Sequence, residues 1–536
     1  MIGNKNGWLV VENAFDADKL NHHETIFTIG NGYLGTRGAF EEYYPNENRS
    51  TFLHGVFDDT PVVFTELANA PDWMELEIWL AGERFSLAEG SLEAYHRELD
   101  MSTATIKRSL TWRSPSGRTT RLEFERFASL ADLHLCALRV QITPLDYTGK
   151  IYVRTGLNGE ADNLGLKHWQ WLDQGARGDS AWLKLRTRGS GVELGQAVRL
   201  MVRHPSQSTR TVNWDLRNHP GLAVSTAAEA GETVSVLKWI TQYTSRDTQK
   251  PLQAARKALA QTGALSWEAA WEAHRAAWEQ EWQRGDVVIE GDDEAQLAVR
   301  FNIFQLLIAA PRTDERVNLG AKTLSGYGYR GHAFWDTEIF MLPFFTYNRP
   351  EIARNLLSYR WHNLPGARQK AAENQFKGAQ YPWESAATGE EVTPTWVANP
   401  QDRTHLIRIW TGDIEIHISA DIAYAIWQYW QNSGDDEFLI KRGAEVILET
   451  ARFWASRVEW KPELDRYEIS DIIGPDEYHD HVDNNIYTNA MARWNLQTAF
   501  QLIDWLAAHA PADLERLKRK IKLRGAELET WKQVIE

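Results

Sequence analysis

The segment HLCALRVQI, from His134 to Ile142, repeats with a period of two. Its even-numbered positions are His134, Cys136, Leu138, Val140 and Ile142, and its odd-numbered positions are Leu135, Ala137, Arg139 and Gln141. This period is typical of a β-strand. Similar short runs occur at 120–127, 150–155, 181–187, 198–204 and 233–243, with turn sequences such as SPSG at 114–117 between them. Many short strands with little helix between them favour a β-sandwich over residues 1–245.

Helical spacing replaces the strand pattern near Asp247. We expect two helices over 247–283, and the second carries Trp267, Trp271, Trp278 and Trp282 on one face. We interpret residues 246–290 as a packed helical linker. Apolar residues keep helical spacing beyond Gly291, which predicts about eight helices in residues 291–536. Long loops such as 376–412 join them, and loops of that length in a compact domain usually carry function.

The composition narrows the class of protein. The chain has 536 residues, a formal net charge of −15 and no run of Lys and Arg, which argues against a nucleic-acid partner. Its one cysteine, Cys136, cannot form an internal disulfide. The N-terminal residues lack the pattern of a signal peptide, and no apolar stretch approaches the roughly 20 residues that span a membrane. We therefore expect a cytoplasmic protein without a membrane partner.

Two segments combine carboxylates, imidazoles and aromatic rings. They are DIIGPDEYHDHVDNNIYTN at 471–489 and GYRGHAFWDTEIF at 328–340, in a chain with 25 tryptophans. An aromatic ring stacks on the apolar face of a sugar, and carboxylates bind sugar hydroxyls and transfer protons. The combination predicts a carbohydrate-active enzyme.

The acidic loop has two alternative interpretations. Its polar residues are Asp476, Glu477, His479, Asp480, His481 and Asp483. Histidine and carboxylate are common metal ligands, but the spacing matches no zinc helix or calcium loop, so we expect no metal. A purely solvated loop is the other alternative. Against it, we expect the flanking Ile472, Ile473, Tyr478 and Tyr487 to be half buried.

The remaining interpretation is acid catalysis. Cleavage of a glycosidic bond needs a carboxylic acid that stays protonated and donates to the departing oxygen. Glu477, between Asp476 and Tyr478, fits this role. Trp335 and Asp336 would supply a stacking face and a carboxylate for the sugar hydroxyls, although Trp335 is also compatible with core packing.

The segment GNGYLG at 30–35 matches the G-x-G-x-x-G pattern of dinucleotide-binding folds. Such a site needs a long helix directly after the last glycine. The following residues are polar and are interrupted by Pro45. We therefore expect a tight turn in the β domain.

Three segments together resemble glycoside hydrolase family 65. They are ETIFTIGNGYLGTRG at 24–38, FWDTE at 334–338 and GPDEYHDHVDNN at 474–485. The resemblance implies an inverting phosphorylase of an α-linked glucose disaccharide, such as maltose, trehalose, kojibiose or nigerose. It also implies a β-sandwich, a helical linker, an (α/α)6 barrel and a small C-terminal β domain. The segment GAQYPWESAATGEEVTP at 378–394 is more similar to the kojibiose or trehalose members than to the maltose members.

The resemblance also assigns roles to residues. Glu477 would be the general acid, and Trp335 and Asp336 would hold the transferred glucosyl unit. The residues implied to face the leaving sugar are Glu415, His417, Trp383 and Glu384. Inorganic phosphate would attack the anomeric carbon from the opposite face and give β-glucose 1-phosphate, with phosphate as co-substrate and no cofactor or metal. A homodimer is common in the family.

The sequence departs from the family in its C-terminal part. The family's phosphate-binding residues follow the catalytic acid at a distance that places them beyond residue 536. Only about eight of the twelve barrel helices are expected, and the C-terminal β domain is absent. Leu528, Trp531 and Ile535 form an apolar stripe that reaches Glu536 without a capping residue. We therefore expect a C-terminally truncated chain. Two alternatives stay open: a hydrolase that uses a base-activated water, and an inactive remnant that binds sugars.

Overall fold

A computed structural model describes residues 2–3, 7–60, 64–203, 209–399, 401–402 and 404–536. The chain forms two compact units. Unit 1 comprises Met1–Thr60, Leu67–Ala310 and Lys322–Gly328, and unit 2 comprises Pro61–Glu66, Pro311–Ala321 and Tyr329–Glu536. Strands dominate the first unit and helices the second, which is the order that the sequence predicted.

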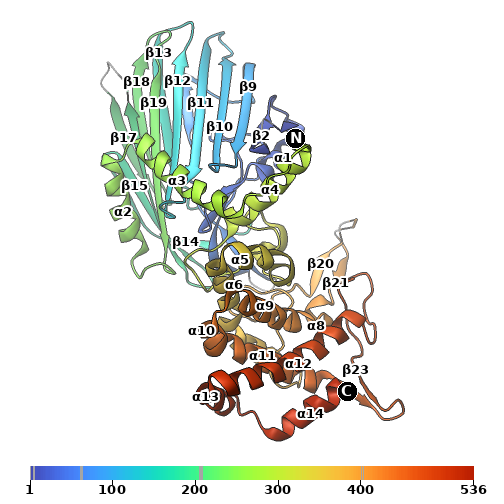
Figure 1. The fold of residues 1–536 in the computed structure, drawn as a ribbon. Helices are drawn as coiled ribbons and strands as arrows, with labels where there is room; N and C mark the ends of the chain where they lie inside the picture. The colour runs from blue at the N-terminus through green and yellow to red at the C-terminus, as the bar shows by residue number, and fades with distance from the viewer. Residues whose placement is uncertain (1, 4–6, 61–63, 204–208, 400, 403) are drawn as a thin grey trace. The chain divides into compact units, whose positions relative to one another are not determined.

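Unit 1 is built on antiparallel sheets (Figure 1). The ten-stranded sheet has the spatial order β1 (Ile2–Gly3), β2 (Leu9–Glu12), β9 (Ser91–Asp100), β10 (Thr105–Arg113), β11 (Thr119–Ala128), β12 (Leu135–Pro144), β19 (Val234–Thr244), β16 (Glu193–Arg203), β15 (Ser180–Thr187) and β14 (Trp169–Arg177). A five-stranded sheet has the order β17 (Arg210–Leu216), β18 (His219–Ala228), β13 (Gly149–Gly156), β7 (Glu77–Leu80) and β8 (Glu83–Arg84). A four-stranded sheet contains β3 (Ile29–Gly30), β4 (Leu34–Thr36), β5 (Thr51–Thr60) and β6 (Phe64–Asn69). Strand β18 of the five-stranded sheet contacts β15 and β16 of the large sheet.

The predicted strand at 134–142 is confirmed as β12, which pairs with β11 and β19. Both of its faces are buried at Leu135–Leu138 because helices cover the side that carries Leu135 and Ala137. These helices are α2 (Pro251–Gln261) and α3 (Trp267–Gly285), in the region predicted to hold two helices. In Figure 1 they run alongside the large sheet. Trp267, Trp278 and Trp282 are buried, as their spacing on one helix face predicted.

The helices α1 (Leu20–Ile26) and α4 (Asp293–Ala309) complete unit 1. The GNGYLG segment forms a tight β3–β4 turn, because Ile29 pairs with Thr36 and Gly30 with Gly35. The side chain of Asn31 closes the turn by accepting hydrogen bonds from the backbone N–H groups of Tyr33 and Leu34, at 3.0 and 3.1 Å. The expectation of a tight turn is confirmed.

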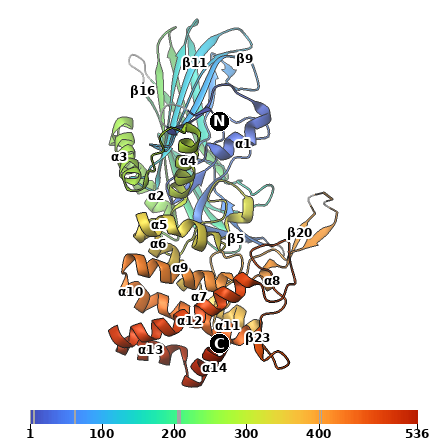
Figure 2. The same ribbon diagram turned by 45° about the vertical axis from the view of Figure 1, so that its right-hand side comes forward.

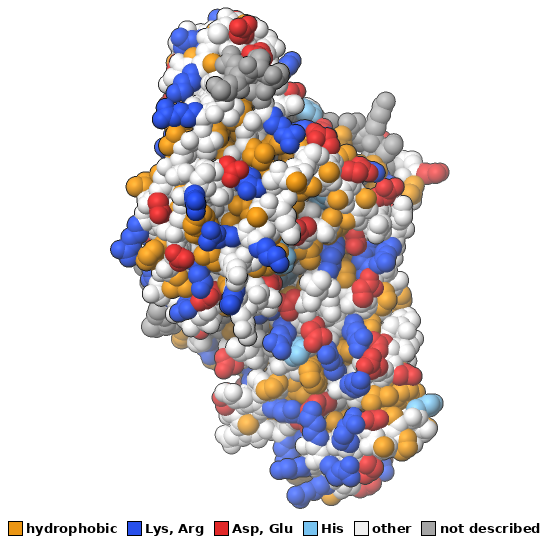
Figure 3. Space-filling view, turned by 90° about the vertical axis from the view of Figure 1, so that its left-hand side faces the viewer, with side chains coloured by type: hydrophobic (Ala, Val, Ile, Leu, Met, Phe, Trp, Pro, Cys, Tyr) orange, Lys and Arg blue, Asp and Glu red, His pale blue; other side chains and the backbone are white. Residues whose placement is uncertain are grey.

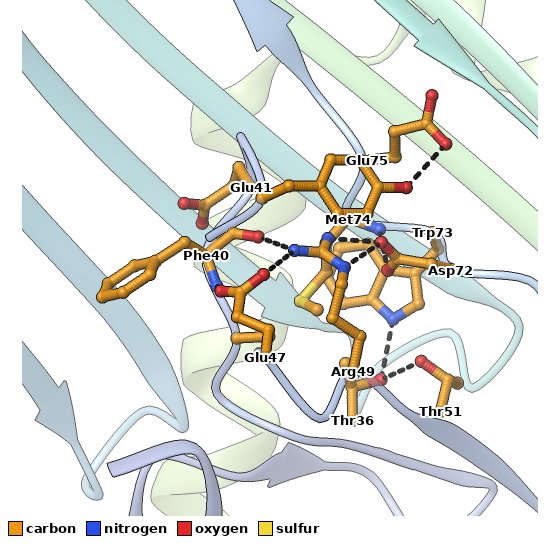
Figure 4. Close-up of polar contacts among 12 residues, drawn as sticks. Thr36, Phe40, Glu41, Glu47, Arg49, Thr51, Asp72, Trp73, Met74 and Glu75 are labelled. Atoms are coloured by element: carbon orange, nitrogen blue, oxygen red, sulfur yellow. Dashed lines mark hydrogen bonds and ion pairs between the residues drawn. The ribbon is translucent and has the colours of Figure 1, made fainter. Parts of the chain in front are cut away.

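Charged side chains are buried inside unit 1. Figure 4 shows the Arg49 guanidinium among the Glu47 and Asp72 carboxylates and the backbone carbonyl of Phe40. A second group joins Glu41 and Glu42 to Arg108 and Arg126. Burying charges is tolerated only where each is paired.

Unit 2 is mainly helical. Its α-helices are α5 (Leu342–Asn348), α6 (Pro350–His362), α7 (Leu364–Glu373), α8 (Thr411–Ile414), α9 (Ile418–Ser433), α10 (Asp436–Phe438), α11 (Ala444–Arg457), α12 (Ile486–His509), α13 (Pro511–Ile521) and α14 (Gly525–Ile535). Short π-helical turns precede α5 at Thr337–Met341 and α11 at Leu439–Gly443. Two small hairpins are β20 (Trp396–Ala398) with β21 (Leu406–Arg408), and β22 (Glu459–Lys461) with β23 (Arg466–Glu468).

Three helices support the candidate site. Helices α9, α11 and α12 contact one another, and both ribbon views show them side by side (Figures 1 and 2). The apolar faces predicted from helical spacing are buried in this packing, for example Ile422 of α9 and Leu496 of α12. Each of α9 and α12 therefore packs against the other and against α11, and candidate site residues lie at the start of these two helices.

The surface shown in Figure 3 carries basic and acidic side chains close together over most of its extent. This mixture agrees with the absence of a Lys and Arg run in the sequence. None of the helices in the described part of the chain is both long and apolar enough to cross a membrane.

Candidate active site

His417 is the centre of the candidate site. It directly precedes α9 and is fully buried. Its Nδ1 lies 2.6 Å from Oδ2 of Asp421, one helical turn further on, and its Nε2 lies 3.3 Å from Oε1 of Glu415. Burial alone would lower the pKa of His417, but the two carboxylates outweigh burial and raise this pKa to about 9. The imidazole is therefore a buried cation at neutral pH.

Three aromatic rings surround this imidazole. The ring centroids of Trp335, Trp383 and Tyr487 lie 4.7, 5.3 and 5.2 Å from that of His417, all edge-on. They come from the FWDTE segment, the long loop before α8 and the first turn of α12. Residues far apart in the sequence therefore converge on one histidine.

A buried ion pair holds the FWDTE segment in place. Arg360 of α6 donates to both carboxylate oxygens of Glu338, each at 2.7 Å, and to the carbonyl of Phe334 at 3.0 Å. The same guanidinium donates to Oγ of Ser385 at 2.9 Å, in the segment that carries Trp383. Because Arg360 contacts both segments, it fixes the two tryptophans relative to each other.

Glu384 is fixed on the same segment. Its Oε2 lies 2.7 Å from Nδ1 of His332, and the other ring nitrogen of His332 lies 2.7 Å from the carbonyl oxygen of Thr65. Backbone hydrogen bonds between Ala333 and Ser385 run in both directions at 2.9 Å. The carboxylate of Glu384 is thus held beside the FWDTE segment.

Glu415 is buried, yet one of its oxygens is unpaired. Oε1 meets His417, while Oε2 has no hydrogen-bond partner in the described part of the chain. Burial is the main reason that the pKa of Glu415 is raised to about 7. The hydrogen bond and positive charge of His417 act to lower this pKa, while repulsion from Glu477 and Asp421 raises it further. This carboxyl group therefore titrates near neutral pH.

Glu477 lies on a braced loop. Ile472 and Val482 pair across the base of the loop, and Ile473 N–H donates to the carbonyl of Ile414 at 3.1 Å. Asp476 accepts from the backbone N–H of Tyr478 at 3.2 Å and lies 2.7 Å from Nδ1 of His479. The loop therefore approaches the Glu415 segment through its backbone.

The Glu477 side chain is exposed to solvent but interacts with the buried groups. Partial desolvation, followed by repulsion from Asp336 and Glu384, raises its pKa, and the His417 cation opposes this shift. Glu477 in turn contributes to the raised pKa of Glu415. Five carboxyl groups, including Asp421, and one imidazolium thus share one electrostatic environment, which is typical of a site for proton transfer.

The structure corrects one expectation for the acidic loop. Ile472 and Ile473 are buried and Tyr487 is partly buried, but Tyr478 is 97% exposed. The side chains of Asp476 and His479 contact each other across the turn, and Tyr478 between them points into solvent. No group of three His, Cys, Asp or Glu side chains suited to a metal ion occurs among the described residues.

Sequence reasoning missed several residues of this arrangement. Asp421 could have been found from its position four residues after His417, because such residues lie on one face of a helix. Arg360 and His332 gave no local signal, since their partners lie 22 and 52 residues away.

A β-rich unit followed by a helical unit that places carboxyl groups against tryptophan rings is the arrangement expected of a carbohydrate-active enzyme. The chain belongs to glycosyl hydrolase family 65. Residues 10–281 match the family's N-terminal domain and residues 300–536 match its central catalytic domain.

Relatives of known activity cover nearly the whole chain. The chain is 43% identical to a kojibiose phosphorylase of Halothermothrix orenii, over 99% of this chain and 70% of that protein. It is 36% identical to a kojibiose phosphorylase of Escherichia coli, over 95% and 68%, and 31% identical to an α,α-trehalose phosphorylase of Thermoanaerobacter brockii, over 99% and 70%.

The fold is also similar to a solved structure, a putative kojibiose phosphorylase from human microbiome. The TM-score is 0.88 at 23% identity, over 99% of this chain and 70% of that one. This match supports a β-rich domain followed by a helical domain. None of the matches confirms the expected truncation.

Proposed function

We propose that this protein is an inverting phosphorylase that converts an α-linked glucose disaccharide and inorganic phosphate into β-glucose 1-phosphate and a free sugar. The observation that supports the proposal is the position of Glu477 on a loop whose backbone contacts the Glu415 segment, where repulsion from Asp336 and Glu384 helps to raise its pKa. A carboxylic acid with a raised pKa holds its proton to higher pH and can donate it to a departing oxygen. Kojibiose is the first substrate to test, because relatives at 36–43% identity bear the name kojibiose phosphorylase.

Each site residue has a role in this reaction. Glu477 protonates the glycosidic oxygen while phosphate attacks the anomeric carbon from the opposite face. Trp335 and Asp336 hold the glucosyl unit by stacking and by hydrogen bonds to hydroxyls. The residues that face the leaving sugar are Glu415, His417, Trp383 and Glu384.

Phosphate replaces the catalytic base of a hydrolase. An inverting hydrolase needs a second carboxylate to activate water, whereas phosphate is already an anionic nucleophile. The reaction therefore needs one protein acid, phosphate as co-substrate and no metal or cofactor.

The finer architecture belongs to the same proposal. Residues 1–245 form a β-sandwich, residues 246–290 a helical linker, and residues 291–536 belong to an (α/α)6 barrel. We further propose a cytoplasmic location and a homodimer, both in keeping with the family resemblance.

The test is an incubation of the protein with kojibiose, trehalose, nigerose and maltose, each with and without phosphate. We expect β-glucose 1-phosphate and free sugar from at least one disaccharide, only when phosphate is present. Phosphorus and proton NMR identify the anomer of the product.

Two results would refute the proposal. Free sugar at equal rates with and without phosphate identifies a hydrolase that uses a base-activated water. Binding of sugar in calorimetry without any turnover identifies an inactive sugar-binding protein.

A further inference from the structure

We propose that Asp421 and Tyr487 are positioning residues for the leaving sugar: acting through His417, they hold Glu415 so that its Oε2 is presented to a hydroxyl group of that sugar. This inference rests on the proposed function, because it assigns Glu415 to the leaving-sugar side of the same site.

A continuous chain of hydrogen bonds joins the residues. The Tyr487 hydroxyl donates to Oδ1 of Asp421 at 2.8 Å. The other oxygen, Oδ2, lies 2.6 Å from Nδ1 of His417, whose Nε2 lies 3.3 Å from Oε1 of Glu415. These hydrogen bonds connect the first turn of α12, the first turn of α9 and the residue that follows α8.

This series of hydrogen bonds ends at Glu415, whose Oε2 has no partner in the described residues. Both oxygens of Asp421 are used, and both ring nitrogens of His417 face carboxylates. Glu415 is 1% exposed, and its Oε2 is buried without a partner in the described residues. A buried polar atom without a hydrogen bond costs about 1–3 kcal/mol, so such atoms usually meet a ligand or water.

The surroundings of Glu415 favour a sugar hydroxyl as the partner of Oε2. Trp335 and Trp383 both lie edge-on to the same imidazole, so a ligand that meets Oε2 also lies near aromatic rings. The loop that carries Glu477 contacts the segment of Glu415 through the hydrogen bond from Ile473 N–H to the carbonyl of Ile414, so both carboxyl groups belong to one region of the site. A hydroxyl can both donate and accept, and therefore suits a carboxyl group in either protonation state.

Tyr487 and Asp421 act through His417 and not on the substrate itself. The first turns of α9 and α12 are held by the packing of their own helices, so the hydrogen bond between them orients the imidazole. Rotation of His417 would release Oε1 of Glu415, and the carboxyl group could then turn. The expected consequence is weaker binding of the leaving sugar, with little change in the binding of the glucosyl unit.

The experiment uses the synthetic direction, in which β-glucose 1-phosphate and the leaving sugar are separate substrates with separate KM values. Tyr487→Phe removes the hydroxyl but keeps the ring against Trp335 and His417. Asp421→Asn keeps the size of the side chain and removes its charge. Tyr429→Phe is the matched control, because Tyr429 lies on α9 outside the site and its hydroxyl donates to Asp435 at 2.9 Å.

We expect Tyr487→Phe to raise the KM of the acceptor sugar about three- to tenfold, the effect of one hydrogen bond. Asp421→Asn raises it more, on the order of ten- to a hundredfold, because a charge-assisted bond is lost. The KM of β-glucose 1-phosphate stays within about twofold in both variants, and Tyr429→Phe changes neither constant. Thermal melting shows whether each variant is folded.

Two results overturn the inference. Equal increases in both KM values of Tyr487→Phe, or an unchanged acceptor KM in that variant, show that the chain of hydrogen bonds does not position Glu415. If the wild-type protein makes no disaccharide from β-glucose 1-phosphate with any acceptor, the proposed function is refuted, and this inference is refuted with it. The first result, with an active wild type, leaves the proposed function intact.

Discussion

Two buried ionic clusters differ in how completely their charges are paired. In unit 1, Arg108 donates to both oxygens of Glu42 and to one oxygen of Glu41, and Arg126 donates to the other oxygen of Glu41. All four carboxylate oxygens therefore have a guanidinium partner. Although burial opposes ionisation, the two guanidinium groups lower the pKa of Glu41 to about 2.

In unit 2 the cation is a titratable imidazole. His417 pairs with Asp421 and Glu415, one oxygen of Glu415 stays unpaired, and the pKa values of His417 and Glu415 are raised to about 9 and about 7. A cluster in which guanidinium groups pair with every carboxylate oxygen is costly to break, whereas a titratable cation beside an unpaired carboxylate oxygen is suited to chemistry. The contrast separates a structural cluster from a functional one.

The largest effect on stability is expected from Arg108→Met. This substitution leaves the buried carboxylates of Glu41 and Glu42 short of a partner, which typically costs about 3–5 kcal/mol. Denaturant unfolding of unit 1 measures this cost. Arg113→Met, at an exposed pair with Glu93, is the control and should cost less than about 1 kcal/mol. Equal costs for the two variants would mean that the buried cluster is not stabilising.

The pH dependence of stability should distinguish the clusters. The raised pKa of His417 contributes stability that is fully present below its unfolded value of 6.5 and is lost as pH rises through about 9. One pKa unit corresponds to about 1.4 kcal/mol, so the contribution is on the order of 3 kcal/mol. The stability difference between wild type and Asp421→Asn should therefore shrink from pH 6 to pH 10.

Arg108→Met supplies the comparison for this titration. Arginine stays charged throughout this pH range, and burial already raises the pKa of Glu42, so the stability difference of this variant should not shrink as His417 loses its proton. Parallel curves for both variants would show that His417 does not titrate as a buried cation.

A smaller effect is expected from Glu384→Gln on the pH profile of activity. Repulsion from Glu384 helps to raise the pKa of Glu477, so the substitution should lower that pKa. The alkaline limb of kcat/KM for phosphorolysis then moves to lower pH. Glu390→Gln, an exposed neighbour on the same loop, should leave the limb in place. A shift to higher pH in Glu384→Gln would contradict the assigned repulsion.

Local patterns predicted local structure well. The period of two at 134–142 became β12, and the spacing of Trp267 and Trp278 correctly indicated that both are buried, because these elements bury one regular face. The acidic loop was harder to predict, since Tyr478 follows a turn and no period defines its burial. The contacts of Arg360 depend on how α6 packs against two loops, which no sequence window contains.

The residue types of the candidate site were also easier to predict than the contacts between them. The carboxyl groups and tryptophans were found by residue type and by resemblance to the family. The contacts of His417 with Trp335, Trp383 and Tyr487 depend on tertiary packing, whereas the pairing of His417 with Asp421 is local and could have been found from their spacing.

The central claim is that Glu477 donates a proton to the leaving sugar. Its most direct test compares Glu477→Gln with wild type on kojibiose and on α-glucosyl fluoride, each with phosphate. Fluoride departs without needing a proton from the enzyme, whereas an alkoxide does. We predict that turnover of the disaccharide falls on the order of 10²–10⁴-fold while turnover of the fluoride stays within about tenfold. Near-normal turnover of the disaccharide, or equal losses on both substrates, would contradict the account.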